Sequence, residues 1–416
     1  MYFSTAHSSW DRKNVIYNGA VFIYLLHMAL MANLTWFYPG LLMRFRMPSF
    51  VFVAAFLLFA LLLRAADGHR FPTGAVVSIL TLLAMLLLGF LHSQENAPYI
   101  KNILFSGYFI KYVILFAAAF LFEDDPDRRV RQLTVIAMLS LLTYQLGAWL
   151  SVYDDSSYMD IGYGCAPWWI LLTQGIFYHK NWIVKLLCTV TSLYFAVFIA
   201  LYGNRGALLL IVLATIILLA TYLPSRYIIV FGGLVLVGVI VLALCWEQIL
   251  LLAEKSFLAG DGVSRNLRLL LSGQLMYDSG RFPIYRACLN SIAEHPFLGV
   301  GACGDRVVTV SHDYAHNIIL ELCVEYGVII GGLIYLFLLY IGFRMLFKCK
   351  DRAWRALFLP FYVFSMVELF FSGTFLQSGH LLASVVIYFA YSACNQRRGN
   401  FKEANIELAS KTQKFH

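Results

Sequence analysis

Residues 186–223 read LLCTVTSLYFAVFIALYGNRGALLLIVLATIILLATYL, and this stretch decides the fold class. Two apolar runs flank the sequence YGNRG, and Arg205 is the only charged residue in the whole stretch. A run of about 17–25 apolar residues is long enough to cross a bilayer as a helix. The stretch therefore predicts two membrane helices joined by a tight turn, in which glycine and Asn204 would supply positive φ.

The same composition extends over the whole chain. Of its 416 residues, 61% are hydrophobic and only 13% are charged, which is about half the charge of a typical soluble domain. We expect an all-α polytopic membrane protein with about twelve transmembrane helices. They fall near 16–37, 49–63, 74–92, 103–122, 133–152, 161–178, 186–202, 207–223, 227–245, 317–346, 357–371 and 379–394.

These spans divide the chain into four parts. Nine helices are expected in 1–245, a large extracytoplasmic loop with interfacial helices in 246–316, three helices in 317–394 and a mobile cytoplasmic tail in 395–416. Within the loop, Trp246 to Ala259 has the amphipathic spacing of a helix lying on the membrane, and a second such helix is expected over Asp261–Gln274.

The basic residues set the orientation. The net charge is +8, but the positive residues are dispersed between spans, which argues against nucleic-acid binding. Twenty of the 31 lysines and arginines lie in segments on the side of the N-terminus, and only four lie in short loops on the other side. By the positive-inside rule both termini are cytoplasmic and the loop faces outward. An enzyme facing outward needs a donor that is already activated, such as a lipid diphosphate.

Polar residues gather in GRFPIYRACLNSIAEHPFLGVGACGDRVVTVSHDYAHNIILELCVEYG, residues 280–327. Pro283 suits the first turn of a helix, so Arg281 would stand at a helix N-terminus, where an anion is well received. Arg286 is five residues further on and would face elsewhere. Arginine grips phosphate oxygens bidentately, and Arg205 could do the same, or could be a snorkelling surface residue.

His316 stands at the start of the next apolar span, followed by Asn317 as a natural helix cap. An imidazole with a pKa near neutrality can remove a hydroxyl proton, although a histidine at a membrane surface is more often only an interfacial residue. Glu321 and Glu325 share a helix face inside this span, where ionisable groups are candidates for function.

Other polar features have plainer readings. The glycines of PFLGVGACG (296–304) lack a preceding strand and a GK[ST] ending, so we expect a compact turn rather than a nucleotide cradle. Lys111 and Glu368 are single charges within spans that could line a central cavity or snorkel. Cys288 and Cys303 share the loop and leave a disulfide open, and no Cys/His spacing matches a zinc site.

Three motifs together resemble the O-antigen ligase and O-antigen or capsular polysaccharide polymerase superfamily of bacterial membrane glycosyltransferases. They are YGNRG at 202–206, SGRFPIY at 279–285 with HPFLGVG at 295–301, and YAHNIILELCVEYG at 314–327. The resemblance implies a helical, GT-C-like fold in the cytoplasmic (inner) membrane, without cofactor or metal. It also implies that Arg205 and Arg281 hold the diphosphate of an undecaprenyl-linked glycan, with Arg286 and Asn317 as further substrate contacts. His316 would activate the acceptor hydroxyl.

The segment YMDIGYGCAPWW at 158–169 looks like capsule-type polymerases, and position 330 is Ile where ligases of the family have Gly, Thr or Tyr. We therefore expect polymerisation of lipid-linked repeat units. The alternatives are a ligase that moves the glycan onto a lipid A-core or other acceptor, and a flippase or transporter of the lipid-linked oligosaccharide. Expected partners are the lipid-linked donor and acceptor, membrane lipids, a chain-length regulator and a flippase, with no nucleic acid.

Overall fold

In a computed structural model of the protein, the described residues form helices and no strand. The structure describes residues 3–37, 39–69, 71–149, 158–224, 280–309 and 313–413. The helix expected over 227–245 and both interfacial helices expected before residue 275 lie outside these ranges. The all-α fold follows from the long apolar runs, because a helix satisfies its own backbone hydrogen bonds inside a membrane.

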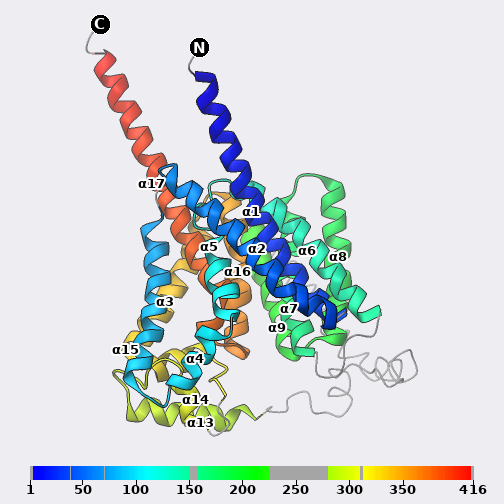
Figure 1. Ribbon diagram of the computed structural model, residues 1–416, viewed down its shortest axis with the longest axis vertical. Helices are drawn as coiled ribbons and strands as arrows, with labels where there is room; N and C mark the ends of the chain where they lie inside the picture. The colour runs from blue at the N-terminus through cyan, green and yellow to red at the C-terminus, as the bar shows by residue number, and fades with distance from the viewer. Residues whose placement is uncertain are drawn as a thin grey trace.

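The first half of the chain is a series of long helices with one interruption (Figure 1). They are α1 Phe3–Phe37, α2 Pro39–Ala66, α3 Thr73–His92, α4 Ala97–Phe105, the π-helix η1 Phe109–Ile114, α5 Leu115–Ala118, α6 Pro126–Trp149, α7 Tyr158–Tyr178, α8 Trp182–Tyr202 and α9 Arg205–Tyr222.

The second half adds two short helices and then returns to the bundle (Figure 1). Its elements are α13 Arg281–Glu294, α14 Gly304–Val308, α15 Ile318–Phe343, the π-helix η2 Arg344–Lys348, α16 Arg352–Phe371, the 3-10 helix η3 Phe375–Gln377 and α17 Gly379–Gln413. The region from Asn395, which we expected to form a mobile tail, continues as part of α17.

Seven described helices are long and apolar enough to cross a membrane, and an eighth is possible if α4 and η1–α5 form one span. The spans expected over 133–152, 161–178 and 379–394 correspond to helices α6, α7 and α17, which are not among these candidates. The span expected over 103–122 corresponds to a bent pair of helices, Ala97–Phe105 and Phe109–Ala118. The chain bends by 63° between Phe105 and Phe109, where Gly107 takes a φ of 69° that other residues rarely adopt.

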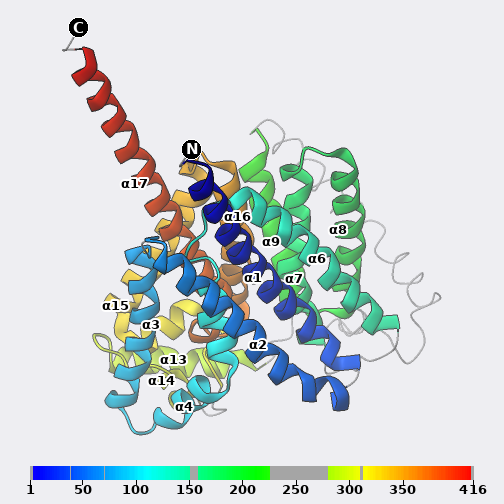
Figure 2. The ribbon, with the colours of Figure 1, turned by 45° about the horizontal axis from the view of Figure 1, so that its top comes forward.

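The bundle is organised around α16, which contacts α6, α7, α9, α15 and α17. In α16, 78% of the span is buried inside the protein, whereas no other candidate span exceeds 44%. Both termini leave the bundle at the same end, in agreement with the expected even number of crossings (Figures 1 and 2). Helices α13 and α14 lie at the opposite end, and we call residues 281–308 the cap.

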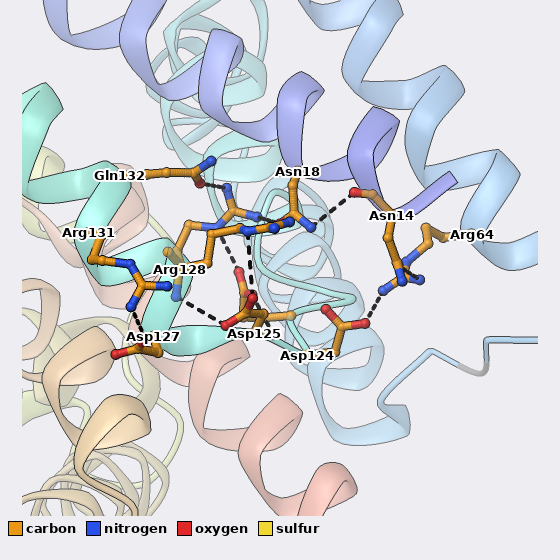
Figure 3. A network of polar contacts seen from close by, with 11 residues as sticks. Asn14, Asn18, Arg64, Asp124, Asp125, Asp127, Arg128, Arg131 and Gln132 are labelled. Atoms are coloured by element: carbon orange, nitrogen blue, oxygen red, sulfur yellow. Dashed lines mark hydrogen bonds and ion pairs between the residues drawn. The ribbon is translucent and has the colours of Figure 1, made fainter. Parts of the chain in front are cut away.

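A polar network closes the bundle near the end where the termini leave (Figure 3). Arg129 and Glu123 form a fully buried ion pair at 2.7 Å, and Arg129 also donates to Asn18 at 2.9 Å. Arg64, which is 2% exposed, binds Asn14 and Asp124. Sequence alone relates these arginines only to membrane orientation, whereas in the structure they also connect α1, α2 and α6.

Candidate active site

Arg281 and His316 come together at the cap end of the bundle. Helix α13 begins at Arg281, as Pro283 predicted, after Gly280 with a φ of 78°. Burial is the main cause that lowers the pKa of His316 to about 4, and the nearby Arg281 guanidinium lowers it further, while Asp313 opposes the shift. The imidazole is therefore neutral near pH 7, the form that can accept a proton.

The backbone of His316 is held in an unusual conformation. Its φ is 52°, in the left-handed region that residues with a Cβ seldom enter. The ring centroids of His316 and Tyr314 lie 4.1 Å apart, and the buried Nδ1 of His316 has no hydrogen-bond partner in the described ranges. Strained residues with unsatisfied polar atoms cluster at functional sites, because the surrounding structure must maintain them.

Asp305 in α14 fixes this backbone. Its Oδ2 accepts the N–H of Ala315 at 2.9 Å, and its Oδ1 accepts the backbone N–H of Arg306 at 2.9 Å and the Arg306 guanidinium at 3.1 Å. Asp305 is fully buried, so burial raises its pKa, while the Arg306 charge opposes the shift. The sequence analysis did not single out Asp305, because its spacing from His316 carries no recognisable pattern.

The two glutamates of α15 face the protein rather than lipid. Glu321 accepts hydrogen bonds from the Thr374 hydroxyl and the Phe375 N–H, and Glu325 accepts the Cys303 N–H at 2.6 Å. With Asp305 they place three carboxylate oxygens within 4.8 Å of one another, a spacing that could hold a metal ion. Because protein donors already bind each carboxylate, we interpret the cluster as the connection between the cap and the bundle.

The glycine-rich turn of the cap docks onto a break in α15. Gly327 has a φ of 75° inside this helix, so the carbonyls before it are free to accept bonds from the turn. Val300 N–H donates to Val324 O at 2.8 Å, and Gly301 N–H donates to Glu325 O at 2.9 Å. A Cβ at Gly327 would overlap the carbonyl of Phe297. The turn is compact, as expected, and its backbone amides attach it to α15.

In the same cap, Cys288 and Cys303 are buried free thiols.

The YGNRG turn packs against Tyr163 of α7, which lies near the candidate active site. Arg205 is the first residue of α9, and the side chain of Asn204 caps the helix by accepting the Ala207 N–H at 2.6 Å. Gly206 lies directly against the Tyr163 hydroxyl. Tyr163 in turn lies within electrostatic range of Arg281 and Tyr314. The turn that carries Arg205 is therefore linked to the other two predicted residues.

The expected reason for the glycine in this turn is wrong. Gly203 has a φ of −86° and Asn204 a φ of −91°, so neither needs the left-handed region. Close packing explains the glycine instead, because a Cβ at Gly203 would lie 2.6 Å from the Ile199 carbonyl and 3.1 Å from Gly162 Cα. Such a contact between helices α7 and α8 cannot be read from the sequence of the turn alone.

The remaining predicted residues have different surroundings. Asn317 caps α15, and its Oδ1 accepts the N–H groups of Ile319 at 3.0 Å and Leu320 at 3.2 Å. Arg286 lies on an exposed side of α13. Glu368 in α16 lies near both Tyr108 and Tyr163. Tyr163 and Tyr314 are the site residues that the sequence analysis missed, although both lie inside motifs that it quoted.

One comparison with known proteins identifies a family. Residues 190–336 match the family model described as O-antigen ligase. No curated protein matches the chain significantly. The matched range includes Arg205, Arg281 and His316 and ends within α15. It indicates a membrane enzyme of the glycosyltransferase type and confirms the resemblance that the motifs suggested. Over residues 190–336, this multi-pass membrane protein is similar to the O-antigen ligase family, which supports the resemblance to the O-antigen ligase and polymerase superfamily.

Proposed function

We propose that the protein polymerises undecaprenyl-diphosphate-linked oligosaccharide repeat units into O-antigen or capsular polysaccharide. The observation that carries this proposal is the proximity of a neutral His316 to the Arg281 charge, which also acts on Tyr163, the residue against the turn that bears Arg205. A base beside two fixed cations suits transfer from a donor whose leaving group is a diphosphate. The cap end would face outward from the bacterial cytoplasmic membrane, where a flippase delivers lipid-linked units.

In this mechanism Arg205 and Arg281 bind the donor diphosphate next to the anomeric carbon. His316 takes the proton from a hydroxyl of the acceptor glycan as that oxygen attacks. The new glycosidic bond forms while the bond between the anomeric carbon and the phosphate oxygen breaks. Because negative charge grows on the departing diphosphate, the two guanidinium groups stabilise the transition state more than the ground state.

The choice of polymerase rests on α7. Its YMDIGYG segment, which resembles capsule-type polymerases, packs on the YGNRG turn through Gly162, where a Cβ would lie 2.9 Å from Asn204 N. The acceptor specificity of a transferase depends on what lines the site, and Tyr163 lies against Gly206 and near the Arg281 charge. The description of the family model favours the ligase as the second candidate.

Glycan transfer in proteoliposomes tests the proposal. The purified protein is supplied with the host's lipid-linked repeat units, with and without a lipid A-core acceptor. A ladder of longer lipid-linked glycans without added acceptor supports the polymerase. If glycan moves only onto the lipid A-core, the protein is a ligase and the proposal is wrong. Movement of intact lipid-linked units across the bilayer without any new glycosidic bond would support the transporter instead.

A further inference from the structure

Two cations outside the candidate active site, Arg46 and Lys111, both contact Tyr112. The guanidinium of Arg46 in α2 donates to the Tyr112 hydroxyl at 3.4 Å. The ammonium of Lys111 lies 4.9 Å from the Tyr112 ring centroid and 4.7 Å from that of Phe50. The Tyr24 hydroxyl bonds to the Lys111 carbonyl at 2.5 Å and so fixes the bent segment that carries the lysine.

Neither cation has a carboxylate partner in the described part of the chain. Lys111 is only 5% exposed, and the ionisable side chains described around it are Arg46, His27, Tyr24 and Tyr112, none of which is a carboxylic acid. Burying a charge is costly unless a counter-charge accompanies it. Contacts with aromatic faces offset part of that cost, but they do not balance two adjacent positive charges. We therefore expect an anion to bind beside Arg46 and Lys111.

We propose that Arg46 and Lys111 bind the diphosphate of a second lipid-linked glycan, the acceptor. This inference rests on the proposed function, because a polymerase must hold two lipid diphosphates at once. One diphosphate leaves at the active site. The other stays on the acceptor, whose reacting hydroxyl lies at the opposite end of its glycan. Its binding site must therefore stand apart from His316.

A row of tyrosines leads from this pair to the active site. The rings of Tyr112 and Tyr108 stack at 4.7 Å, and Tyr108 is 46% exposed. Glu368 lies near both Tyr108 and Tyr163, and Tyr163 is in turn near Arg281. Aromatic faces and a carboxylate suit the apolar faces and the hydroxyl groups of sugars, so a repeat unit could lie along this row.

Binding stoichiometry tests the proposal without relying on activity. Full-length protein in nanodiscs of phosphatidylcholine is titrated with undecaprenyl diphosphate alone, and bound lipid is counted by native mass spectrometry. We expect two bound molecules for the wild type and one for the double variant Arg46→Gln/Lys111→Gln. Lys101→Gln, which removes an exposed cation from neighbouring α4, should leave two. Two molecules on the double variant would overturn the proposal.

A parallel titration with cardiolipin separates the acceptor lipid from ordinary anionic phospholipid. If the double variant loses cardiolipin but keeps both undecaprenyl diphosphates, the pair is a phospholipid site and the proposal is wrong. Lys111→Arg keeps the charge and should keep the second molecule, which controls for misfolding.

Kinetics distinguish this inference from the proposed function. In the ladder assay we expect the double variant to raise the KM for lipid-linked acceptor at least tenfold. Transfer to a soluble repeat-unit glycan that lacks the diphosphate should remain unchanged. An equal loss with both acceptors contradicts a diphosphate site. Absence of a ladder from wild-type protein contradicts the proposed function, while the lipid count still decides the site.

Discussion

Asp305 binds the residue that precedes His316, because its Oδ2 accepts the N–H of Ala315 at 2.9 Å. A carboxylate thus fixes the backbone from which the candidate base projects. We expect Asp305→Asn to lower the rate of glycan transfer ten- to a hundredfold. Loss of a buried hydrogen bond should also lower the free energy of unfolding by about 1–3 kcal/mol. Glu294→Gln, an exposed change in α13, should alter neither. Wild-type rates with Asp305→Asn would contradict a positioning role.

The pH dependence of transfer should follow His316. Burial and Arg281 lower its pKa to about 4, so the neutral base persists well below pH 6.5. We expect kcat/KM to stay constant between pH 7 and 5 and to fall only as the pH approaches about 4. An acid limb centred near 6.5, the ordinary value for histidine, would show that His316 is not the base in this environment.

That measurement needs a stability control. The unfolded chain binds a proton at His316 near pH 6.5, whereas the folded chain does so only near pH 4. The folded state therefore loses stability as the pH falls from about 6.5 toward 4. Activity should be fully recovered when protein exposed to each low pH is returned to pH 7.

We expect that Gly327, where α15 is broken, cannot be replaced by a residue with a side chain. Gly327 combines a φ of 75° with a ψ of 167°, and a Cβ there would overlap the Phe297 carbonyl. We expect Gly327→Ala to cost roughly 1–3 kcal/mol from the backbone alone, with the overlap in addition. Gly332→Ala in the same helix meets nothing within 4 Å and should change stability by no more than about 1 kcal/mol. Thermal unfolding in detergent compares them, and equal melting temperatures would contradict the docking of the turn.

The buried pair at the other end of the bundle offers a test of the fold. Arg129→Met leaves Glu123 buried without its partner and should destabilise the protein by about 3–5 kcal/mol. Arg129→Met with Glu123→Leu removes both charges and should recover most of the loss. If the double variant is no more stable than the single one, the pair does not explain the stability of this end.

Much of the fold was predictable, because apolar length alone identifies membrane helices. The expected span 207–223 corresponds to α9 at Arg205–Tyr222, and 357–371 lies within α16. Contacts between distant segments were not predictable. Glu321 and Glu325 stood out as ionisable groups within a span, but the sequence does not show their partners, which are Phe375 of η3 and Cys303 of the cap.

In the candidate site too, some residues could be predicted from the sequence and others could not. Arg281 and His316 stand out as polar residues in an apolar chain, and the structure brings them together. Asp305 does not stand out in this way, because the loop contains several acidic residues. The sequence does not show which of them accepts the Ala315 N–H. Gly203 was singled out for the wrong reason, since its packing against Gly162 depends on the approach of α7 to the end of α8.

A single-turnover assay of undecaprenyl diphosphate release tests the roles of His316 and Arg281 most directly. It compares wild type, His316→Ala, Arg281→Ala and the exposed control His295→Ala, each with lipid-linked repeat units in proteoliposomes. The proposed mechanism predicts that release and glycan extension proceed together in wild type and His295→Ala. Both should fall at least a hundredfold in His316→Ala and Arg281→Ala. Undiminished release and extension in His316→Ala would contradict the assignment of the base.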